Sequence, residues 1–272
     1  MANPFLSCVH THTHFCDGKD APEVTVKKAL EFGFVSLGFS GHAPTYWDEA
    51  AMIKEDLPKY IAEIQRLQKV YDGQIEILLG IEYGMLSDRD DFPFDYSIES
   101  VHAFKMGDRL CYVDWAWEKV LPGIEEVFGG DVYAYTKAYY QACCSSYEKS
   151  TCQIAGHLDL VTKFNEQYPI MDPTEPRYLS AALEAADTAI NRGLILEVNT
   201  GAISRGYRTT PYPHPAILKY LLDRKAPVVV TSDCHAAENL TCHYDETAEL
   251  LRSVGFKSTL RLRKSGWEEI GL

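Results

Sequence analysis

The sequence predicts an α/β fold, a distorted (β/α)7 TIM-like barrel, built as one domain over residues 1–272. Two observations support this prediction. Short apolar runs alternate with helical patterns along the chain, which is typical of βα units and a parallel sheet. Polar residues that can bind a metal follow most of these runs, and barrels of this kind carry their chemistry at the carboxyl ends of the strands.

The first third of the chain sets this pattern. Residues 5–10 form the first apolar run, and Pro22 suits the first turn of the helix that follows. We expect that helix to bury Phe32 and to end at Gly33. A second apolar strand then covers residues 35–40.

The next elements follow the same rules. Apolar residues at helical spacing, from Ile61 to Val70, predict a helix over residues 57–71 with these side chains on its buried face. Residues 75–81 are rich in Ile and Leu, as in a fully buried strand, and residues 95–101 form a weaker strand.

Residues 107–150 are mostly helical in pattern and rich in Tyr and Trp. This segment is long enough to cover the mouth of a site, and the sequence leaves open whether it closes over a ligand or packs on the barrel. The later predicted strands and helices alternate. The strands cover residues 153–155, 194–198, 228–230 and 258–262, and the helices cover residues 177–192, 215–224 and 244–254. Seven strands precede candidate ligands or polar ends, so we expect seven rather than eight staves.

Composition narrows the function. The net charge of −13 argues against nucleic acid as a partner, because phosphates would be repelled. The eight cysteines include no C-x-x-C pair, and no signal peptide or membrane-length apolar run is visible. We therefore expect a soluble, cytoplasmic protein with reduced thiols and no contact with membranes.

Histidines and carboxylates at the strand ends predict a metal centre. His10 and His12 lie on one face of the first strand, and Asp233 and His235 repeat that spacing after the last buried run. Glu82 would otherwise be a charge at the edge of the core. Taken singly, each remaining histidine is more often a core residue, but their shared place favours ligation. The nine predicted ligands are His10, His12, Asp17, His42, Glu82, His102, His157, Asp233 and His235.

Nine such ligands suffice for two ions, or for three with bridging carboxylates. Nitrogen and oxygen donors without cysteine favour the divalent ions of Zn, Mn or Fe. Such a cluster can activate water and clamp an in-line displacement at phosphorus. We expect Asp233, His42 and Glu82 to act in the reaction.

Basic residues near these strand ends are candidates for binding substrate. Arg205 and Arg208 lie in a glycine-containing loop, and Lys163 follows His157 along the chain. Arginine offers a forked donor that matches phosphate. His243 is a further candidate for facing the substrate. Each could instead be an ordinary surface residue.

The motifs that contain these residues resemble those of one known family. They are His10-Thr11-His12-Thr13-His14-Phe15-Cys16-Asp17-Gly18, Phe39-Ser40-Gly41-His42-Ala43-Pro44, Gly80-Ile81-Glu82, Ser100-Val101-His102, Gly156-His157-Leu158-Asp159-Leu160 and Ser232-Asp233-Cys234-His235. Over nearly the full length, the chain resembles the polymerase and histidinol phosphatase (PHP) superfamily, most closely the monofunctional histidinol-phosphatase type.

This resemblance implies a trinuclear centre of divalent transition-metal ions held by the nine residues above. It also implies hydrolysis of a small phosphomonoester, L-histidinol phosphate, to L-histidinol and phosphate, a late step of histidine biosynthesis. Arg205 and Lys163 would then stabilise the phosphoryl oxygens, and Asp233 or a nearby histidine would protonate the leaving oxygen. Lys163 stands where the family often has arginine.

Three alternatives remain. A PHP phosphoesterase acting on a nucleotide or another small phosphomonoester would use the same metals and loops. An amidohydrolase also begins with His-x-His, but usually needs a bridging lysine, and no lysine ends a buried run here. A noncatalytic metal-binding module would retain metal without turnover. The sequence leaves the oligomeric state open.

Overall fold

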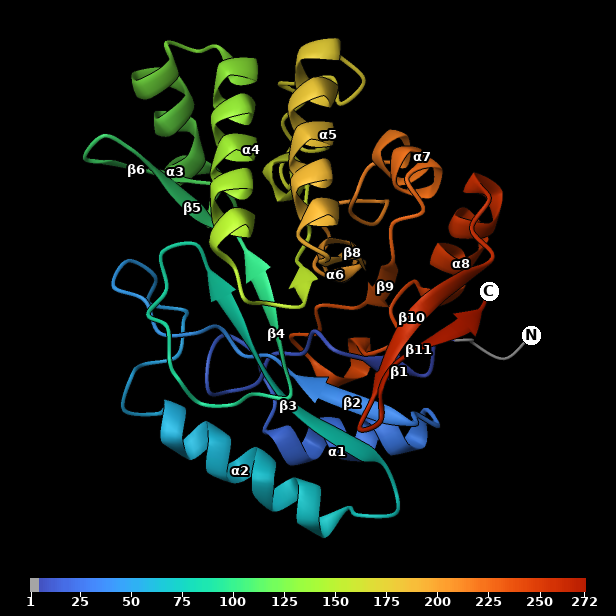
Figure 1. Cartoon of the computed structure of the whole chain (residues 1–272). Helices are drawn as coiled ribbons and strands as arrows, with labels where there is room; N and C mark the ends of the chain where they lie inside the picture. Colours follow the sequence, from blue (N-terminus) through green and yellow to red (C-terminus); the bar gives the residue numbers. More distant parts are fainter. Residues whose placement is uncertain (1–4) are drawn as a thin grey trace.

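The computed structural model describes residues 5–272 and is dominated by a strongly curled nine-stranded sheet, which helices surround (Figure 1). Its strands pair in parallel throughout, except for the final antiparallel pair. In spatial order they are β1 (Ser7–Cys8), β2 (Ser36–Phe39), β3 (Glu76–Gly84), β4 (Tyr96–Ser100), β7 (Ile154–Ala155), β8 (Ile195–Asn199), β9 (Val228–Thr231), β10 (Ser258–Arg263) and β11 (Gly266–Gly271).

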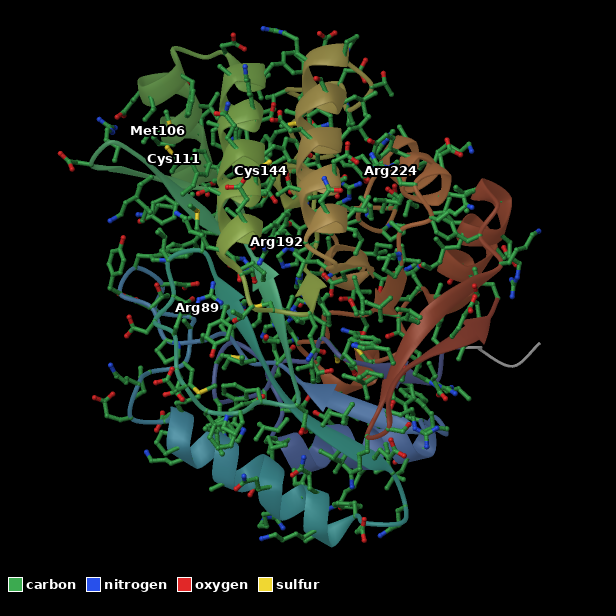
Figure 2. The ribbon with its side chains drawn as sticks, viewed as in Figure 1. Arg89, Met106, Cys111, Cys144, Arg192 and Arg224 are labelled. Atoms are coloured by element: carbon green, nitrogen blue, oxygen red, sulfur yellow. The ribbon has the colours of Figure 1, made fainter. Side chains whose placement is uncertain are left out.

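Helices cover the outside of this sheet. The α-helices are α1 (Pro22–Glu31), α2 (Leu57–Val70), α3 (Trp117–Pro122), α4 (Val132–Lys149), α5 (Pro176–Asn191), α6 (Gly201–Ser204), α7 (Pro215–Asp223) and α8 (Tyr244–Val254). Short helical turns are the π-type η1 (Gly123–Val127) and the 3-10 turns η2 (Leu160–Thr162) and η3 (Ala237–Asn239). Helices α4 and α5 lie side by side, and side chains such as Cys144 occupy the region around them (Figures 1 and 2).

The segments that follow β1 and β9 meet at the carboxyl rim of the strands. The Cys234 N–H donates to the His10 carbonyl at 3.1 Å, and the His12 N–H donates to the Cys234 carbonyl at 2.8 Å. These bonds join the segment after β1 to the segment after β9, as the parallel bridge between Thr11 and Cys234 also shows. The first and last predicted ligand motifs are therefore neighbours in space.

Successive inward-facing residues along the strands form two layers in the barrel interior. On β3, Leu78 and Glu82 share a face, and on β8 Ile195 and Glu197 share a face, with the apolar residue first in each case. The lower layer is apolar and buried. It consists of Val9, Leu78, Tyr96, Ile98, Ile154, Ile195, Val229 and Leu262, drawn from almost every strand around the barrel. The polar layer above it carries the predicted site.

The prediction of a distorted seven-stranded barrel is confirmed. Seven parallel strands, β1 to β4 and β7 to β9, form the barrel wall. Strands β10 and β11 continue the sheet as a C-terminal hairpin. The sequence analysis anticipated β10 but missed β11. The first strand is also shorter than expected, because only Ser7–Cys8 pair regularly with β2.

Two predicted buried positions are wrong. Val70 is 52% exposed, because three successive steps of three residues from Ile61 rotate by about half a turn around a helix with 3.6 residues per turn. The buried face of α2 instead carries Leu57, Tyr60, Ile64 and Leu67, at alternating steps of three and four. Phe32 is 37% exposed because it lies just beyond the last residue of α1.

The segment 107–150 is less helical than its composition predicts. It begins inside a two-stranded hairpin formed by β5 (Ala103–Met106) and β6 (Arg109–Tyr112), and continues through α3 and η1 into α4. The side chains of α4 pack toward the barrel and α5: the Tyr139 hydroxyl donates to the Leu158 carbonyl at 3.0 Å, and the Tyr140 hydroxyl to the Tyr178 hydroxyl at 2.7 Å. In this structure α4 therefore packs on the barrel.

All eight cysteines are free in the structure. Across residues 5–272, no helix combines the length and the apolar character needed to cross a membrane. The description as a single domain over residues 1–272 stays a prediction.

Replacement of Gly80 by alanine should destabilise the barrel. A Cβ at this position would lie 2.3 Å from Cζ of Tyr96, whose ring belongs to the buried apolar layer. Overpacking of this kind costs about 1–3 kcal/mol. Urea denaturation of Gly80→Ala should show this loss, whereas Gly271→Ala, where nothing lies within 4 Å, should change stability by less than about 0.5 kcal/mol. Equal stability of the two variants would contradict the packing of Tyr96 against β3.

Candidate metal centre

All nine predicted ligands converge at the carboxyl rim of the barrel. Their ligand atoms fall into four overlapping groups, within each of which every atom lies within 4.8 Å of the others. The groups are His12, Asp17, His42 and His235; His10, His12 and Asp233; His10, Glu82 and His157; and His42, Glu82 and His102. Because groups share members, the arrangement suits several neighbouring ions rather than one.

Two histidine nitrogens lie close to two carboxylate oxygens at the centre of the cluster. His12 Nε2 lies 3.2 Å from Asp233 Oδ1 and 3.5 Å from Glu82 Oε2. His10 Nε2 lies 3.3 Å from Glu82 Oε2 and 3.6 Å from Asp233 Oδ1. Four ligands about 2.0–2.1 Å from a central ion would be roughly 3.3 Å apart. The four distances between histidine and carboxylate atoms are near this value, and His10, His12 and Asp233 lie close enough together to share one ion.

The other oxygen of Glu82 faces a second pair of histidines. His102 Nε2 and His157 Nε2 each lie 3.1 Å from Glu82 Oε1, and the Ser100 hydroxyl donates to the same oxygen at 2.7 Å. His42 Nδ1 is 2.9 Å from Glu82 Oε2. The two oxygens of Glu82 thus face different histidines, as a carboxylate that bridges two ions would.

Asp17 forms the outer edge of the cluster. Its Oδ2 lies 3.0 Å from His235 Nε2, and its Oδ1 lies 3.7 Å from His42 Nε2. A Cβ on the adjacent Gly18 would lie 2.4 Å from the Thr13 nitrogen, so only glycine lets this loop fold back closely enough to present Asp17.

The position of Asp233 also depends on its backbone conformation and on a neighbouring glycine. Its backbone is left-handed, with φ of 44°, a conformation that aspartate tolerates better than most residues. A Cβ on Gly201 would lie 2.7 Å from the Asp233 Cβ. Glycine at the start of α6 therefore makes room for the carboxylate.

Misaligned polar atoms support a metal at this place. His10 Nε2, His12 Nε2 and Glu82 Oε2 are buried, yet none has a hydrogen-bond partner of acceptable geometry among residues 5–272. Each of the two nitrogens lies 3.3 to 3.5 Å from the Glu82 oxygen, and no hydrogen bond of acceptable geometry fills the space between these atoms. Buried polar atoms without partners are costly, and a divalent cation in that space would satisfy all three.

The charges of the cluster also call for cations. Burial raises the pKa of the Glu82 carboxyl, but His10, His42 and His102 outweigh this effect and hold that pKa well below its usual range. Burial lowers the pKa of His42, while Glu82 and Asp17 raise it to about 8. Burial, followed by His235 and His42, lowers the pKa of His12 to about 3. Neutral His12 is ready to bind a metal, whereas His42 must first lose a proton.

A polar cavity of about 210 Å³ opens onto this cluster. Its wall includes two predicted phosphate-binding residues, Lys163 and Arg205. The complete lining is Asp17, His42, Glu82, His102, Asp114, His157, Leu160, Lys163, Arg205, Tyr207, Asp233 and His235. Positive donors and metal-ligand candidates therefore face the same space.

Both basic residues are held in place by the rim. Arg205 donates to Asp233 Oδ2 and to the Asp233 carbonyl, each at 3.0 Å, and contacts His235 Nδ1 at 2.7 Å. Lys163 donates to the Asp114 carbonyl at 2.5 Å, and its Nζ lies 4.7 Å from the centre of the Tyr207 ring. Fixed donors of this kind lose little entropy when they bind an anion.

The structure does not bring the other two predicted substrate residues to the cavity. Arg208 bonds to the Thr162 hydroxyl, donates to the Thr210 carbonyl at 3.2 Å and lies over the Tyr212 ring. His243 is 3.8 Å from Glu246 at the exposed start of α8. Neither belongs to the described lining of the cavity. Both were selected by proximity in sequence, which is a weak guide to loop direction.

Sequence reasoning missed two carboxylates beside the ligands. Asp114 Oδ1 lies 3.3 Å from His102 Nδ1, and Glu197 Oε1 lies 2.5 Å from His10 Nδ1. A signal for Glu197 existed, because it is a charged residue in a buried strand and shares a face with the strand end. Asp114 had no such signal, because it lies in the irregular segment after β6.

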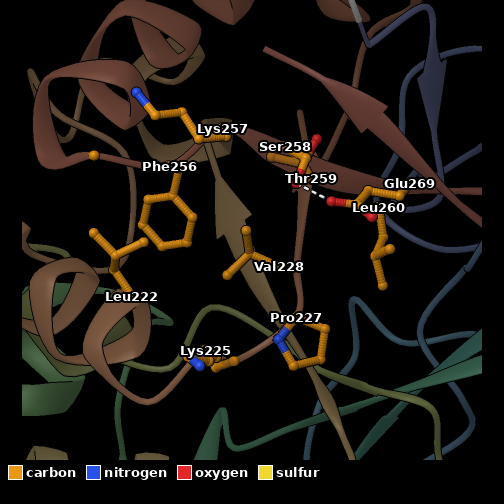
Figure 3. A pocket seen from close by; sticks show the side chains of 12 residues that line it. Leu222, Lys225, Pro227, Val228, Phe256, Lys257, Ser258, Thr259, Leu260 and Glu269 are labelled. Atoms are coloured by element: carbon orange, nitrogen blue, oxygen red, sulfur yellow. Dashed lines mark hydrogen bonds between the residues drawn. The ribbon is translucent and has the colours of Figure 1, made fainter.

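A larger cavity, of about 430 Å³, lies elsewhere (Figure 3). It is formed by the ends of α7 and α8, the start of β9, and the terminal hairpin, at the opposite end of the strands from the ligands. The side chains of Leu222, Val228 and Phe256 gather around it, and Ser258 is hydrogen-bonded to Glu269 at its edge. None of the nine predicted ligands is in its described lining, so we place the chemistry in the smaller polar cavity.

The fold and this donor set define a class of metal-binding hydrolase, and comparison with known proteins gives the family. A model of the PHP domain matches residues 9–201, and the chain belongs to that family.

Within the family, the chain is related to histidinol-phosphatases. It is 30% identical to a probable histidinol-phosphatase of Deinococcus radiodurans, over 94% of this chain and 96% of that protein. It is 29% identical to the histidinol-phosphatase of Bacillus subtilis, over 88% and 97% of the two chains.

Solved structures share the fold. A putative histidinol phosphatase of Listeria monocytogenes superposes with a TM-score of 0.78 at 23% identity, covering 88% of this chain and 99% of that one. A histidinol phosphate phosphatase of Lactococcus lactis, solved with zinc, L-histidinol and phosphate, gives a TM-score of 0.67 at 22% identity, covering 96% and 98%. At these identities the likeness establishes the distorted barrel.

Metal binding should release protons from this cluster. His42, with a pKa of about 8, is largely protonated at neutral pH, and a metal binds only the neutral imidazole. We expect the apparent affinity for Mn²⁺ to fall as the pH is lowered below about 8. Calorimetric titration in two buffers of different ionisation enthalpy will count the protons released. An affinity that does not change with pH, with no proton release, would contradict this assignment.

Proposed function

We propose that this protein is a metal-dependent phosphomonoesterase that hydrolyses L-histidinol phosphate to L-histidinol and phosphate. The observation that carries the proposal is the convergence of nine ligand candidates with Lys163 and Arg205 on one small cavity. The relation to histidinol-phosphatases at about 30% identity over nearly the whole chain supports the choice of substrate.

We assign three divalent ions to the nine ligands, with Mn, Fe and Zn as candidates. The mixed nitrogen and oxygen donors suit these metals, and the four overlapping groups exceed what one ion needs. Bound there, the ions would supply Lewis acidity and lower the pKa of water. The protein's own contribution is to hold His42 and Glu82 at the cavity wall in fixed positions.

The basic residues would bind the phosphoryl group. Lys163 has three donors, of which the Asp114 carbonyl takes one, and Arg205 presents its guanidinium on the same wall. Charge-assisted hydrogen bonds from these groups to phosphoryl oxygens would orient the ester and offset charge in the transition state.

Asp233 suits the role of ligand better than that of proton donor. Burial raises its pKa, but Arg205 and His10 outweigh this and hold it well below the usual range. The carboxylate is therefore ionised at neutral pH. It can bind a cation and anchor Arg205, but it has no proton to give to the leaving oxygen.

A PHP phosphoesterase acting on another small phosphomonoester is the second candidate. The cavity of about 210 Å³ is smaller than the roughly 300–1,000 Å³ typical of pockets for drug-sized ligands, which favours a compact ester over a nucleotide. The net charge of −13 disfavours binding to nucleic acid, so we propose a small-molecule substrate and no nucleic-acid partner.

Phosphate release will test the activity. Metal-reconstituted protein should hydrolyse histidinol phosphate faster than nucleoside monophosphates.

Glu82→Gln should lower kcat at least about a hundredfold, because it removes charge from the bridging position. The matched control is Glu99→Gln: Glu99 is equally buried, on β4, but its partners are Arg89, Ser146 and Ser150 (Arg89 is labelled in Figure 2). Preference for a nucleotide would replace the first candidate by the second, and no turnover on any ester would sink both.

The role of Lys163 predicts a separate effect. Lys163→Met should raise KM or lower kcat/KM about ten- to a hundredfold, because a hydrogen bond to a charged group contributes about 1.5–3 kcal/mol. Metal content should stay the same, since the amine is not one of the ligand candidates. Lys219→Met, which removes an exposed lysine paired with Asp223 on α7, is the control. Unchanged kinetics in Lys163→Met would remove this residue from the binding site.

A further inference from the structure

The buried carboxylate of Glu197 lies behind the metal-ligand cluster. It is fully buried on β8, two residues before the end of that strand, and is not in the described lining of the cavity. Four donors converge on its two oxygens. Oε1 accepts from His10 Nδ1 at 2.5 Å and from the Thr231 hydroxyl at 2.7 Å, while Oε2 accepts from the His157 N–H at 2.6 Å and from Asn199 Nδ2 at 3.0 Å.

These contacts connect several strand ends. His10 follows β1, His157 follows β7, and Thr231 ends β9. The Glu197 carboxylate therefore links the ends of β1, β7 and β9 to β8. Two of the partners are ligand candidates. Glu197 fixes the ring of one and the backbone of the other.

The contact with His10 decides which nitrogen can bind a metal. A carboxylate can only accept a hydrogen bond, so Nδ1 of His10 must carry the proton. In the neutral imidazole that binds a metal, the lone pair then lies on Nε2, the atom that faces Glu82 and Asp233 at 3.3 and 3.6 Å. The ring cannot rotate away, because its far side is held at 2.5 Å. Partners of this kind orient ligating histidines and make them more basic.

We propose that Glu197 is a positioning residue of the metal centre, which fixes the tautomer and direction of His10 and anchors His157. This inference rests on the proposed metal-binding function. Asp114 makes a comparable contact with His102, but at 3.3 Å and from the cavity wall, where it is also 3.6 Å from Lys163. Glu197 is not part of the described lining of the polar cavity, so we expect it to affect the reaction through the ligand candidates.

Glu197→Gln is the informative substitution. It keeps the size of the side chain but offers an acceptor at only one end, whereas donors approach both ends of the native carboxylate. Either the His10 ring or the His157 N–H then meets an NH₂ group. We expect Mn²⁺ affinity to fall about ten- to a hundredfold and the bound stoichiometry to drop at limiting metal.

The measurement is metal content and affinity, by elemental analysis and calorimetry, with the apo-protein Tm recorded in parallel. Glu99→Gln is the matched control, since it removes an equally buried charge that contacts no ligand candidate. This control should bind Mn²⁺ within about twofold of wild type even if its Tm falls. A purely structural role would lower the Tm of Glu197→Gln and leave its metal affinity unchanged, which would overturn the proposal.

A second variant covers the case in which Glu197→Gln does not fold. Glu197→Asp keeps the charge and withdraws the carboxylate by one methylene, so metal affinity should lie between those of wild type and the glutamine variant. Wild-type affinity in Glu197→Asp would also overturn the proposal. Failure of wild type to bind metal would instead refute the proposed function, and metal binding without phosphatase turnover would refute only the proposed activity.

Discussion

The burial of Glu82 is the constraint on which the rest of the site depends. A carboxylate with no exposure to solvent is costly unless positive or donating groups surround it. Here imidazoles approach both of its oxygens, at 2.9 to 3.5 Å, and Ser100 adds a hydroxyl. Two of these nitrogens, on His10 and His12, lack well-directed partners among residues 5–272. The cluster is thus arranged around space for cations rather than as a set of ion pairs.

The curl of the sheet makes that cluster possible. The inward-facing residues of the strands are apolar in the lower layer, which includes Tyr96, and polar at the carboxyl ends, where the cavity opens. The rim hydrogen bonds between the His10–His12 segment and Cys234 then bring together motifs that are separated by more than two hundred residues. The close packing of this apolar layer resists rearrangement of the ligand candidates above it.

Much of the site was predictable because the residues that bind metals are chemically distinctive. Histidine and aspartate after apolar runs, as at His42 and Asp233, are unusual enough to stand out. Residues that act through other residues are harder to find. Glu197 stands out in the sequence only as a charged residue within a buried strand, and its role follows from its contact with His10; Asp114 belongs to a segment without regular periodicity. The loop that carries Arg208 turns its side chain toward Thr162, outside the described lining of the polar cavity.

By itself the sequence determined the fold class, the alternation of strands and helices, and the identity of the nine ligand candidates, because each depends on local patterns of polarity and residue type. Only the tertiary structure decided how the ligand atoms are spaced and which basic side chains line the cavity. It also decided that α4 packs against the barrel and α5. Those properties depend on the curvature of the sheet and on loop direction. Both arise from contacts between segments distant in the chain, which no local pattern records.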